Sequence, residues 1–183
     1  MYYGLKSHGQ VLASRDTGRE IREKMEQLIA QMSASDVLSI DLDGIVAISP
    51  SAADELFGRL FSELSGGQFR SRRVVLENVD PDAGEILSGV LKRREVFAPA
   101  VNHGKLELLG APEYLEETYR AALSLKEFTT ADIADRFHLT VQAANNRVVK
   151  LLRTNLVSRK ESSARRGGRE YVYSAGAVYS AGA

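Results

Sequence analysis

Cysteine is absent from this 183-residue sequence, histidine occurs only three times, and no long apolar run is present. Without cysteine, the chain can have no disulfide framework, no zinc–thiolate site and no cysteine nucleophile. No apolar run approaches the roughly 18 residues of a membrane-spanning helix. The N-terminus also lacks the basic segment followed by an apolar one that opens a secretory signal. We therefore expect a soluble, cytoplasmic protein with no membrane partner.

Catalytic and metal-binding motifs are missing as well. The histidines, which show none of the spacings typical of metal ligands, are His8, His103 and His138. There is no HExxH sequence and no glycine-rich loop with a P-loop lysine. The best candidates for acid–base or Mg²⁺ chemistry are Asp41 and Asp43, which precede Gly44. Such a pair at the end of a strand is more often a solvated turn, so we predict no catalytic residue, no metal, no cofactor and no enzymatic activity.

The composition is that of an ordinary globular protein, but the charge is divided unevenly along the chain. Apolar residues make up 44% of the sequence and charged residues 26%, a balance that suits one large domain or two small ones. From Lys126 to the end, ten Lys and Arg face five Asp and Glu, whereas fourteen face nineteen before Lys126. A basic C-terminal part is typical of a nucleic-acid contact, although a solvated basic surface would have the same composition.

The first 110 residues alternate short apolar runs with amphipathic helical patterns. The elements predicted in chain order are a strand at 9–15, a helix from Thr17 to about residue 32, a strand at 37–44, a helix from Pro50 to Leu64, a strand at 72–79 and a helix at 82–92. Two short strands around an Asn-His-Gly turn then end the region near Gly110. This order predicts an α/β domain at 1–110 with a parallel or mixed sheet.

Residues 111–183 have a different pattern, with three helices followed by a β-hairpin. Pro112 begins the first helix, and Thr129 with Asp132 forms a capping-box sequence at the start of the second. A third helix covers Leu139–Arg153, and the strands of the hairpin flank an arginine-rich, glycine-containing loop. The tail repeats YSAGA twice, which we interpret as a frayed extension without function.

The helix LTVQAANNRVVKLLR has an unusual polar face. On a helical projection its apolar side consists of Val141, Ala144, Val148, Leu151 and Leu152. The opposite side carries Gln142, Asn146, Lys150 and Arg153, and the helix contains no acidic residue. Amides and cations are the side chains that contact base edges and phosphates, so this face favours an interaction with nucleic acid.

With these elements in order, residues 112–173 resemble the winged helix-turn-helix domain of bacterial transcription regulators. The matching features are a short support helix, a helix started by Thr140, the Leu-Val sequence after it, and a Gly-Arg near the return strand of the wing. Two positions depart from the family: Asn155 replaces the usual glycine before Leu-Val, and His138 stands where glycine is common. Asn155 tolerates the left-handed conformation that a helix C-cap needs.

The resemblance implies that this region binds double-stranded DNA with its third helix in the major groove. The implied contact residues are Thr140, Gln142, Asn146, Arg147, Lys150 and Arg153 on the helix, and Arg165, Arg166 and Arg169 on the wing. Gln142 and Asn146 would offer their amides to adenine, and Arg147 would reach guanine or phosphate. The remaining cations would meet the backbone or the minor groove.

Residues 9–109 resemble the STAS-like domain family of unknown function, which is related in outline to the anti-sigma-factor antagonists. The resemblance lies in the segments GQVLASRDTGREI, IDLDGIVAISPSAADELFGRL and RVVLENV. The serine that is phosphorylated in true antagonists corresponds to Ser51, the candidate regulatory site. The family's Asp two residues earlier is Ser49, and its following Gly is Ala52. Ser49 before Pro50 is also a sequence typical of a helix N-cap, and Ser51 with Asp54 offers a second capping register.

These patterns together predict a small STAS-like mixed-sheet domain followed by a winged helix-turn-helix domain. The function we expect is that of a homodimeric, DNA-binding transcription regulator whose STAS-like domain binds a partner, a signal or a second copy of itself. The alternative is a protein-interaction module of a partner-switching pathway, with a regulatory kinase or ATPase as partner.

Overall fold

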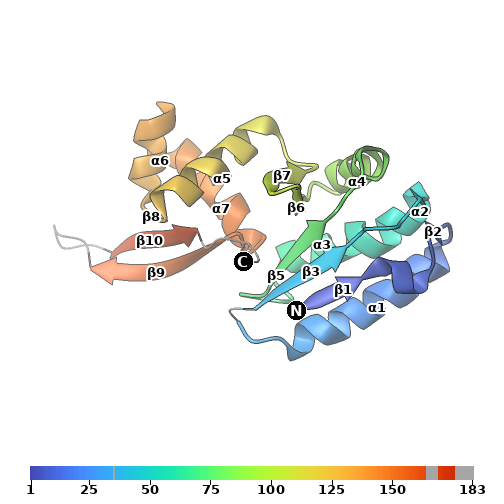
Figure 1. The fold of residues 1–183 in the computed structure, drawn as a ribbon. Helices are drawn as coiled ribbons and strands as arrows, with labels where there is room; N and C mark the ends of the chain where they lie inside the picture. Colours follow the sequence, from blue (N-terminus) through green and yellow to red (C-terminus); the bar gives the residue numbers. More distant parts are fainter. Residues whose placement is uncertain (35, 164–168, 176–183) are drawn as a thin grey trace. The chain divides into compact units, whose positions relative to one another are not determined.

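The computed structural model describes residues 1–34, 36–163 and 169–175, and it forms two compact units (Figure 1). Unit 1 is Met1–Ala111 and unit 2 is Pro112–Ala183. The division falls next to Gly110, where the sequence pattern changes.

Unit 1 is built on a five-stranded mixed sheet, as the alternation of strands and helices predicted. Its strands, in spatial order, are β1 (Tyr2–Gly4), β3 (Val37–Asp41), β5 (Arg73–Glu77), β6 (Ala98–Asn102) and β7 (Lys105–Leu109). The first four are parallel, and β7 returns antiparallel to β6. His103 and Gly104 close this hairpin with φ values of 49° and 75°, the combination that a tight two-residue turn requires.

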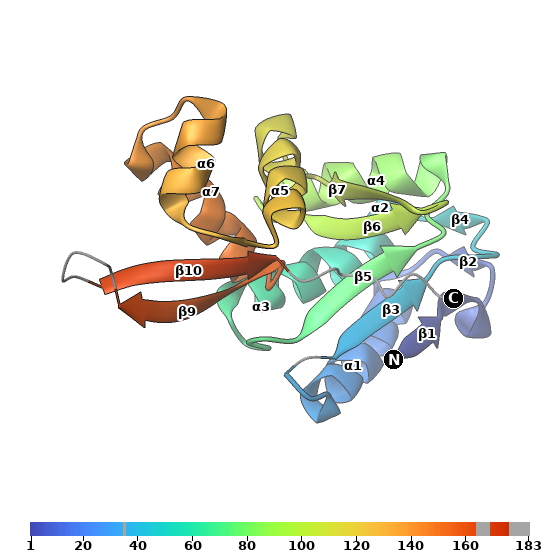
Figure 2. The same ribbon diagram turned by 60° about the vertical axis from the view of Figure 1, so that its left-hand side comes forward.

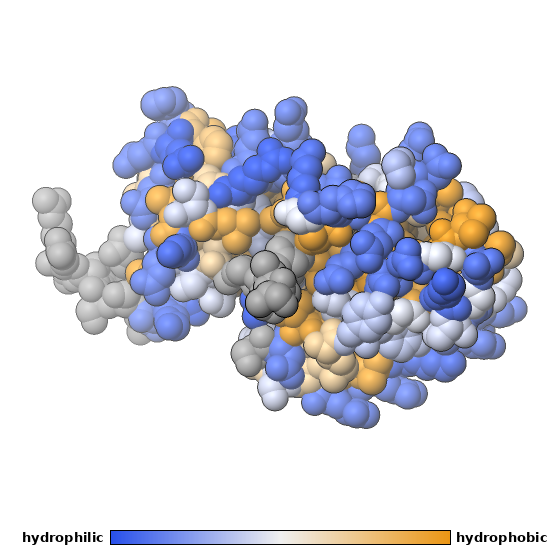
Figure 3. All heavy atoms as spheres, in the orientation of Figure 1, coloured by the Kyte–Doolittle hydropathy of each residue, from blue (hydrophilic) through white to orange (hydrophobic). Residues whose placement is uncertain are grey.

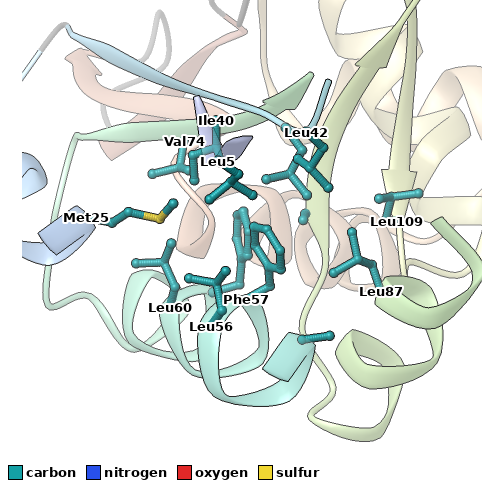
Figure 4. Packing of buried hydrophobic residues seen from close by; sticks show 14 of the residues in the cluster. Leu5, Met25, Ile40, Leu42, Leu56, Phe57, Leu60, Val74, Leu87 and Leu109 are labelled. Carbon is teal, nitrogen blue, oxygen red and sulfur yellow. The ribbon is translucent and has the colours of Figure 1, made fainter. Parts of the chain in front are cut away.

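Helices cover this sheet and share one apolar core with it. They are α1 (Arg15–Gln31), α2 (Pro50–Ala53), η2 (Asp54–Gly58), α3 (Arg59–Gly66) and α4 (Pro81–Arg93). Figure 4 shows Met25 of α1 and Phe57 of η2 meeting Ile40 and Val74 of the sheet, all of them buried. The outer side of α1 carries mainly hydrophilic side chains (Figure 3). Side chains of the helices and of the sheet therefore meet in one core.

Two features of unit 1 differ from the sequence prediction. The strand expected at 9–15 is only β2 (Val11–Leu12), which pairs with β4 (Ala47–Ile48) in a separate parallel sheet. The edge of the main sheet is instead β1, whose three residues are too few to show an alternating pattern. The expected helix from Pro50 to Leu64 continues to Gly66 and contains the π-helical turn η2.

The described part of unit 2 forms three helices and a three-stranded antiparallel sheet. The helices are α5 (Glu113–Leu125), α6 (Thr130–Phe137) and α7 (Val141–Arg153), and the strands are β8 (Glu127–Phe128), β9 (Val157–Ser163) and β10 (Arg169–Ala175), in the spatial order β8, β10, β9. Figures 1 and 2 show the helices gathered over one end of the β9–β10 hairpin. The two-residue β8 was not predicted; it is held by pairing of Phe128 with Tyr173, whose rings stack at 5.7 Å.

Local sequence signals explain where the helices of unit 2 begin and end. Thr129 accepts a hydrogen bond from the Asp132 amide while Asp132 accepts one from the Thr129 amide, so the predicted capping box is confirmed. His138 ends α6 in the left-handed conformation with φ 52°, and Asn155 does the same after α7 with φ 58°. A three-residue turn, 138–140, therefore separates α6 from α7.

Candidate nucleic-acid interface

Helix α7 presents its polar face to solvent because its apolar face is fixed inside unit 2. Ala144, Val148 and Leu151 are fully buried, and the Thr140 hydroxyl caps the helix by accepting a hydrogen bond from the Ala143 amide at 3.2 Å. Helix α6 and the N-terminal part of α5 pack beside it. The exposed residues of α7 are Val141, Gln142, Asn146, Lys150 and Arg153, with the capping Thr140 beside them. Thr140, Gln142, Asn146, Lys150 and Arg153 are thus brought together on one accessible surface.

Val141 is a correction to the helical projection. The projection placed it on the apolar face with Ala144, but its side chain is 61% exposed. It occupies the first turn, and the elements that bury Ala144 and Val148 do not cover it. The interface therefore includes one apolar residue among polar ones.

Gln142 and Asn146 form a coupled pair of amides. The Gln142 Nε2 donates a hydrogen bond to the Asn146 Oδ1 at 3.1 Å, one helical turn along the exposed face. This bond leaves the Oε1 of Gln142 as an acceptor, and the second hydrogen of the Gln142 Nε2 and both hydrogens of the Asn146 Nδ2 as donors. An acceptor beside a donor is the complement of the N6 and N7 edge of adenine in the major groove.

Arg147 lies differently from the other predicted contact residues. Its guanidinium carbon is 4.8 Å from the ring centroid of Tyr114 and 5.5 Å from that of Phe137, and its NH1 donates to the Thr118 Oγ1 at 3.3 Å. The side chain is half-buried and connects α7 to α5 and α6. The contact of Arg147 with guanine or phosphate stays a prediction, and the observed partners give this residue a role in packing.

Lys150 and Arg153 supply positive charge at the C-terminal part of the exposed face. The Lys150 Nζ donates to the hydroxyl of Tyr114 at 3.0 Å and stays exposed. Arg153 is exposed too, with no partner among the residues that the structure describes. The sequence reading overlooked Tyr114, although an aromatic residue in the first turn of α5 was visible. A hydroxyl paired with an ammonium group is chemically suited to phosphate contact.

The hairpin contributes cations that the sequence reading overlooked. Arg159 of β9 stacks on Tyr171 of β10 with its guanidinium 4.3 Å from the ring centroid, and both side chains are exposed. Lys160 is exposed next to it. The predicted wing residues Arg165 and Arg166 lie outside the described residues, and for Arg169 only the backbone position at the start of β10 is described.

Charge is arranged asymmetrically within unit 2. From Arg136 to Lys160 the sequence contains six Lys and Arg and no Asp or Glu, and this segment comprises the 138–140 turn, α7 and the start of β9. Unit 1 carries thirteen Lys and Arg against sixteen Asp and Glu, whereas unit 2 carries eleven against eight. The net charge is therefore negative in unit 1 and positive in unit 2. An acid-free stretch spanning an exposed helix face is the arrangement that attracts a polyanion.

The Ser49–Ser51 region of unit 1 behaves as a helix start. The Ser49 Oγ accepts a hydrogen bond from the Ala52 amide at 3.1 Å and donates one to the Ala13 carbonyl at 2.7 Å, which confirms Ser49 as the N-cap. Ser51 is half-buried inside the helix with its Oγ 3.0 Å from that of Ser49, so the second capping register is wrong. Phosphorylation of Ser51 stays a prediction.

Asp41, at the carboxyl edge of the unit 1 sheet, is saturated with hydrogen-bond donors. It accepts from the Asn78 Nδ2 at 2.7 Å, from the Asp43 amide at 3.0 Å and from the Tyr2 hydroxyl. Burial raises the pKa of Asp41, but these hydrogen bonds outweigh burial and hold the pKa below its usual value. The same bond to Asp41 raises the pKa of Tyr2 to about 12. Asp43, the other carboxylate of the pair considered from the sequence, is exposed.

Within the described part of the chain, no group of three or more His, Asp or Glu is placed to hold a metal ion. No helix among those residues is both long and apolar enough to cross a membrane. Comparisons of the chain with protein-family models, with curated proteins and with solved structures each found no match.

Proposed function

We propose that the protein is a cytoplasmic, non-enzymatic transcription regulator that binds duplex DNA through unit 2. The observation that carries this proposal is the exposed, acid-free face of α7, on which a coupled amide pair is followed by Lys150 and Arg153. The order of α5, α6, α7 and an antiparallel hairpin, with three residues between α6 and α7, supports a winged helix-turn-helix domain. In that arrangement α7 enters the major groove and the hairpin is the wing.

Unit 1 is proposed to be the STAS-like regulatory domain. Its mixed sheet, with helices and sheet sharing one core, supports this assignment. We further propose that the chain acts as a homodimer, because a single small reading helix contacts few base pairs and two-fold pairing doubles the site. In this proposal unit 1 supplies the partner, signal or self-association surface, with Ser51 as the candidate regulatory position.

The test is a salt titration of DNA binding by the full-length chain. A duplex retained from a random pool is first identified, and its affinity is measured at several salt concentrations. Replacing both Lys150 and Arg153 with Gln should reduce the slope of log K against log salt by about 2, since each phosphate contact contributes about 0.9. The matched control replaces Lys24 and Lys105, two exposed cations of unit 1, with Gln.

The expected result is a reduced slope in the α7 variant and an unchanged slope in the control. Equal slopes in both variants would remove α7 from the DNA interface. Salt-insensitive binding to a protein partner together with no retained DNA would instead favour the partner-switching alternative, in which unit 2 is a docking surface for a kinase or ATPase.

A further inference from the structure

Val141, the first residue of α7, is an exposed apolar residue next to the exposed polar residues Thr140 and Gln142. At 61% exposure it is the most exposed large apolar side chain in the described part of unit 2, where Leu125 and Tyr171 reach 36% and 38%. Helix propensity does not explain a valine at this position, because β-branched residues are slightly unfavourable in helices. In a hydrophobic staple, the residue before the N-cap packs against the fourth residue of the helix, and these two positions are Leu139 and Ala144 here. Neither core packing nor capping therefore explains Val141.

The side chain of Val141 is held in a defined place. The Thr140 cap fixes the first turn of α7 through the Ala143 amide at 3.2 Å. A β-branched side chain in a helix has one strongly preferred rotamer, so its methyl groups are preorganised. The next residue, Gln142, is bonded to Asn146 at 3.1 Å, which orders the amide pair beside it. The first turn thus presents two rigid methyl groups next to an acceptor and a donor.

From this juxtaposition we infer that Val141 determines specificity by contacting the C5-methyl group of a thymine that adjoins the adenine contacted by Gln142 and Asn146. Among the edges of the four standard bases in the major groove, only thymine carries a methyl group. The contact removes apolar surface of both partners from water, whereas any other base would place a polar edge against the valine. The inference rests on the proposed function, and it identifies the preferred ligand as duplex DNA with adjacent thymine and adenine in the major groove.

The experiment removes the thymine methyl groups one at a time. In the duplex retained from a random pool, each thymine is replaced in turn by deoxyuridine, which lacks only the methyl, and the affinity of the full-length chain is measured. One position per half-site should lose about fourfold in affinity, the equivalent of about 0.8 kcal/mol for one buried methyl group. Deoxyuridine at the other thymines should have no effect.

Protein variants connect that loss to Val141. The Val141→Ser chain should bind the thymine and deoxyuridine duplexes equally at this position and still discriminate against replacement of the adjacent adenine. Val141→Thr keeps one methyl group and should retain part of the discrimination. Val46→Ser, a change at a valine of unit 1 that is 72% exposed, is the matched control and should behave as wild type.

The inference is overturned if the wild-type chain tolerates deoxyuridine at every position, a result that does not depend on the folding of any variant. It is also overturned if Val141→Ser keeps the same fourfold loss. Failure to retain any duplex from the pool has a different meaning, because it would overturn the proposed DNA binding itself.

Discussion

The packing of Arg147 predicts that this cation stabilises unit 2, whereas the exposed Arg153 of the same helix is proposed to contact DNA. Replacing Arg147 with Ala removes two cation–π contacts, each of about 0.5–1 kcal/mol, and a charged hydrogen bond to Thr118. We expect a loss of about 2 kcal/mol in the free energy of opening α5–α7, which corresponds to roughly a 30-fold loss of amide protection. Hydrogen exchange on the full chain measures this loss directly, segment by segment.

Arg153→Ala is the matched control for Arg147→Ala, because it removes the same charge from the same helix. Arg153 is exposed, so its replacement should change amide protection by less than about 0.5 kcal/mol and weaken DNA binding at every sequence. Arg147→Lys should restore only part of the protection, since an ammonium group lacks the planar surface that stacks on Tyr114. Unchanged protection in Arg147→Ala, together with a loss of affinity equal to that of Arg153→Ala, would refute the packing role.

Three further predictions concern unit 1 and the assembly. Ser49→Ala should lower the free energy of unfolding by about 1 kcal/mol, because it removes the hydrogen-bond acceptor of the Ala52 amide. Equal melting temperatures for Ser49→Ala and wild type would contradict this capping role. Ser51→Asp should change the free energy of unfolding by less than about 0.5 kcal/mol, since an acidic residue in the first turn of a helix is favourable. Because the bond to Asp41 raises the pKa of Tyr2 from 10.0 to about 12, it stabilises the fold below pH 10, and that contribution is lost as pH rises from 10 to 12. Tyr2→Phe should therefore flatten the alkaline fall in melting temperature, and an identical pH profile in both chains would count against the bond. Light scattering should show a dimer at micromolar concentration or on DNA, and a monomer under both conditions would disprove dimerisation.

The features that the sequence predicted well are those encoded over a few neighbouring residues. The capping box of Thr129 and Asp132 is complete within four positions, and the observed helix α6 begins where that sequence indicates. The tight turn at His103 and Gly104 is likewise a local signal. The alternation of apolar runs and helical patterns was enough to predict the mixed sheet, because burial of one face imposes a period on the sequence.

The features that the sequence could not predict depend on partners distant along the chain. Strand β1 exists through its pairing with β3, more than thirty residues away, and has no periodic pattern of its own. The resemblance to winged helices implied a DNA contact for Arg147, and it contains no information on where Tyr114 of α5 lies. Helical projection placed Val141 on the apolar face, but it gives only an angle about the helix axis and does not show where the elements that cover this face end.

The π-helical turn at Asp54–Gly58 restricts how the length of unit 1 can vary. Arg94 packs closely against this turn, since a Cβ atom on Gly58 would lie 2.7 Å from the Nε of Arg94. Arg94 also donates two hydrogen bonds, of 2.7 and 2.9 Å, to the carboxylate of Asp54. A π-turn accommodates one residue more than an α-helical turn, and each residue rotates a helix by about 100°. Deleting one residue between 54 and 58 would therefore convert this turn into a regular α-helical one and leave Leu60 and Leu64 facing the core that they now fill. Deleting a residue from the regular helix α3 would instead rotate the residues after it by about 100°. Natural variants of this chain should consequently tolerate the loss of one residue at 54–58 more readily than elsewhere between Pro50 and Gly66.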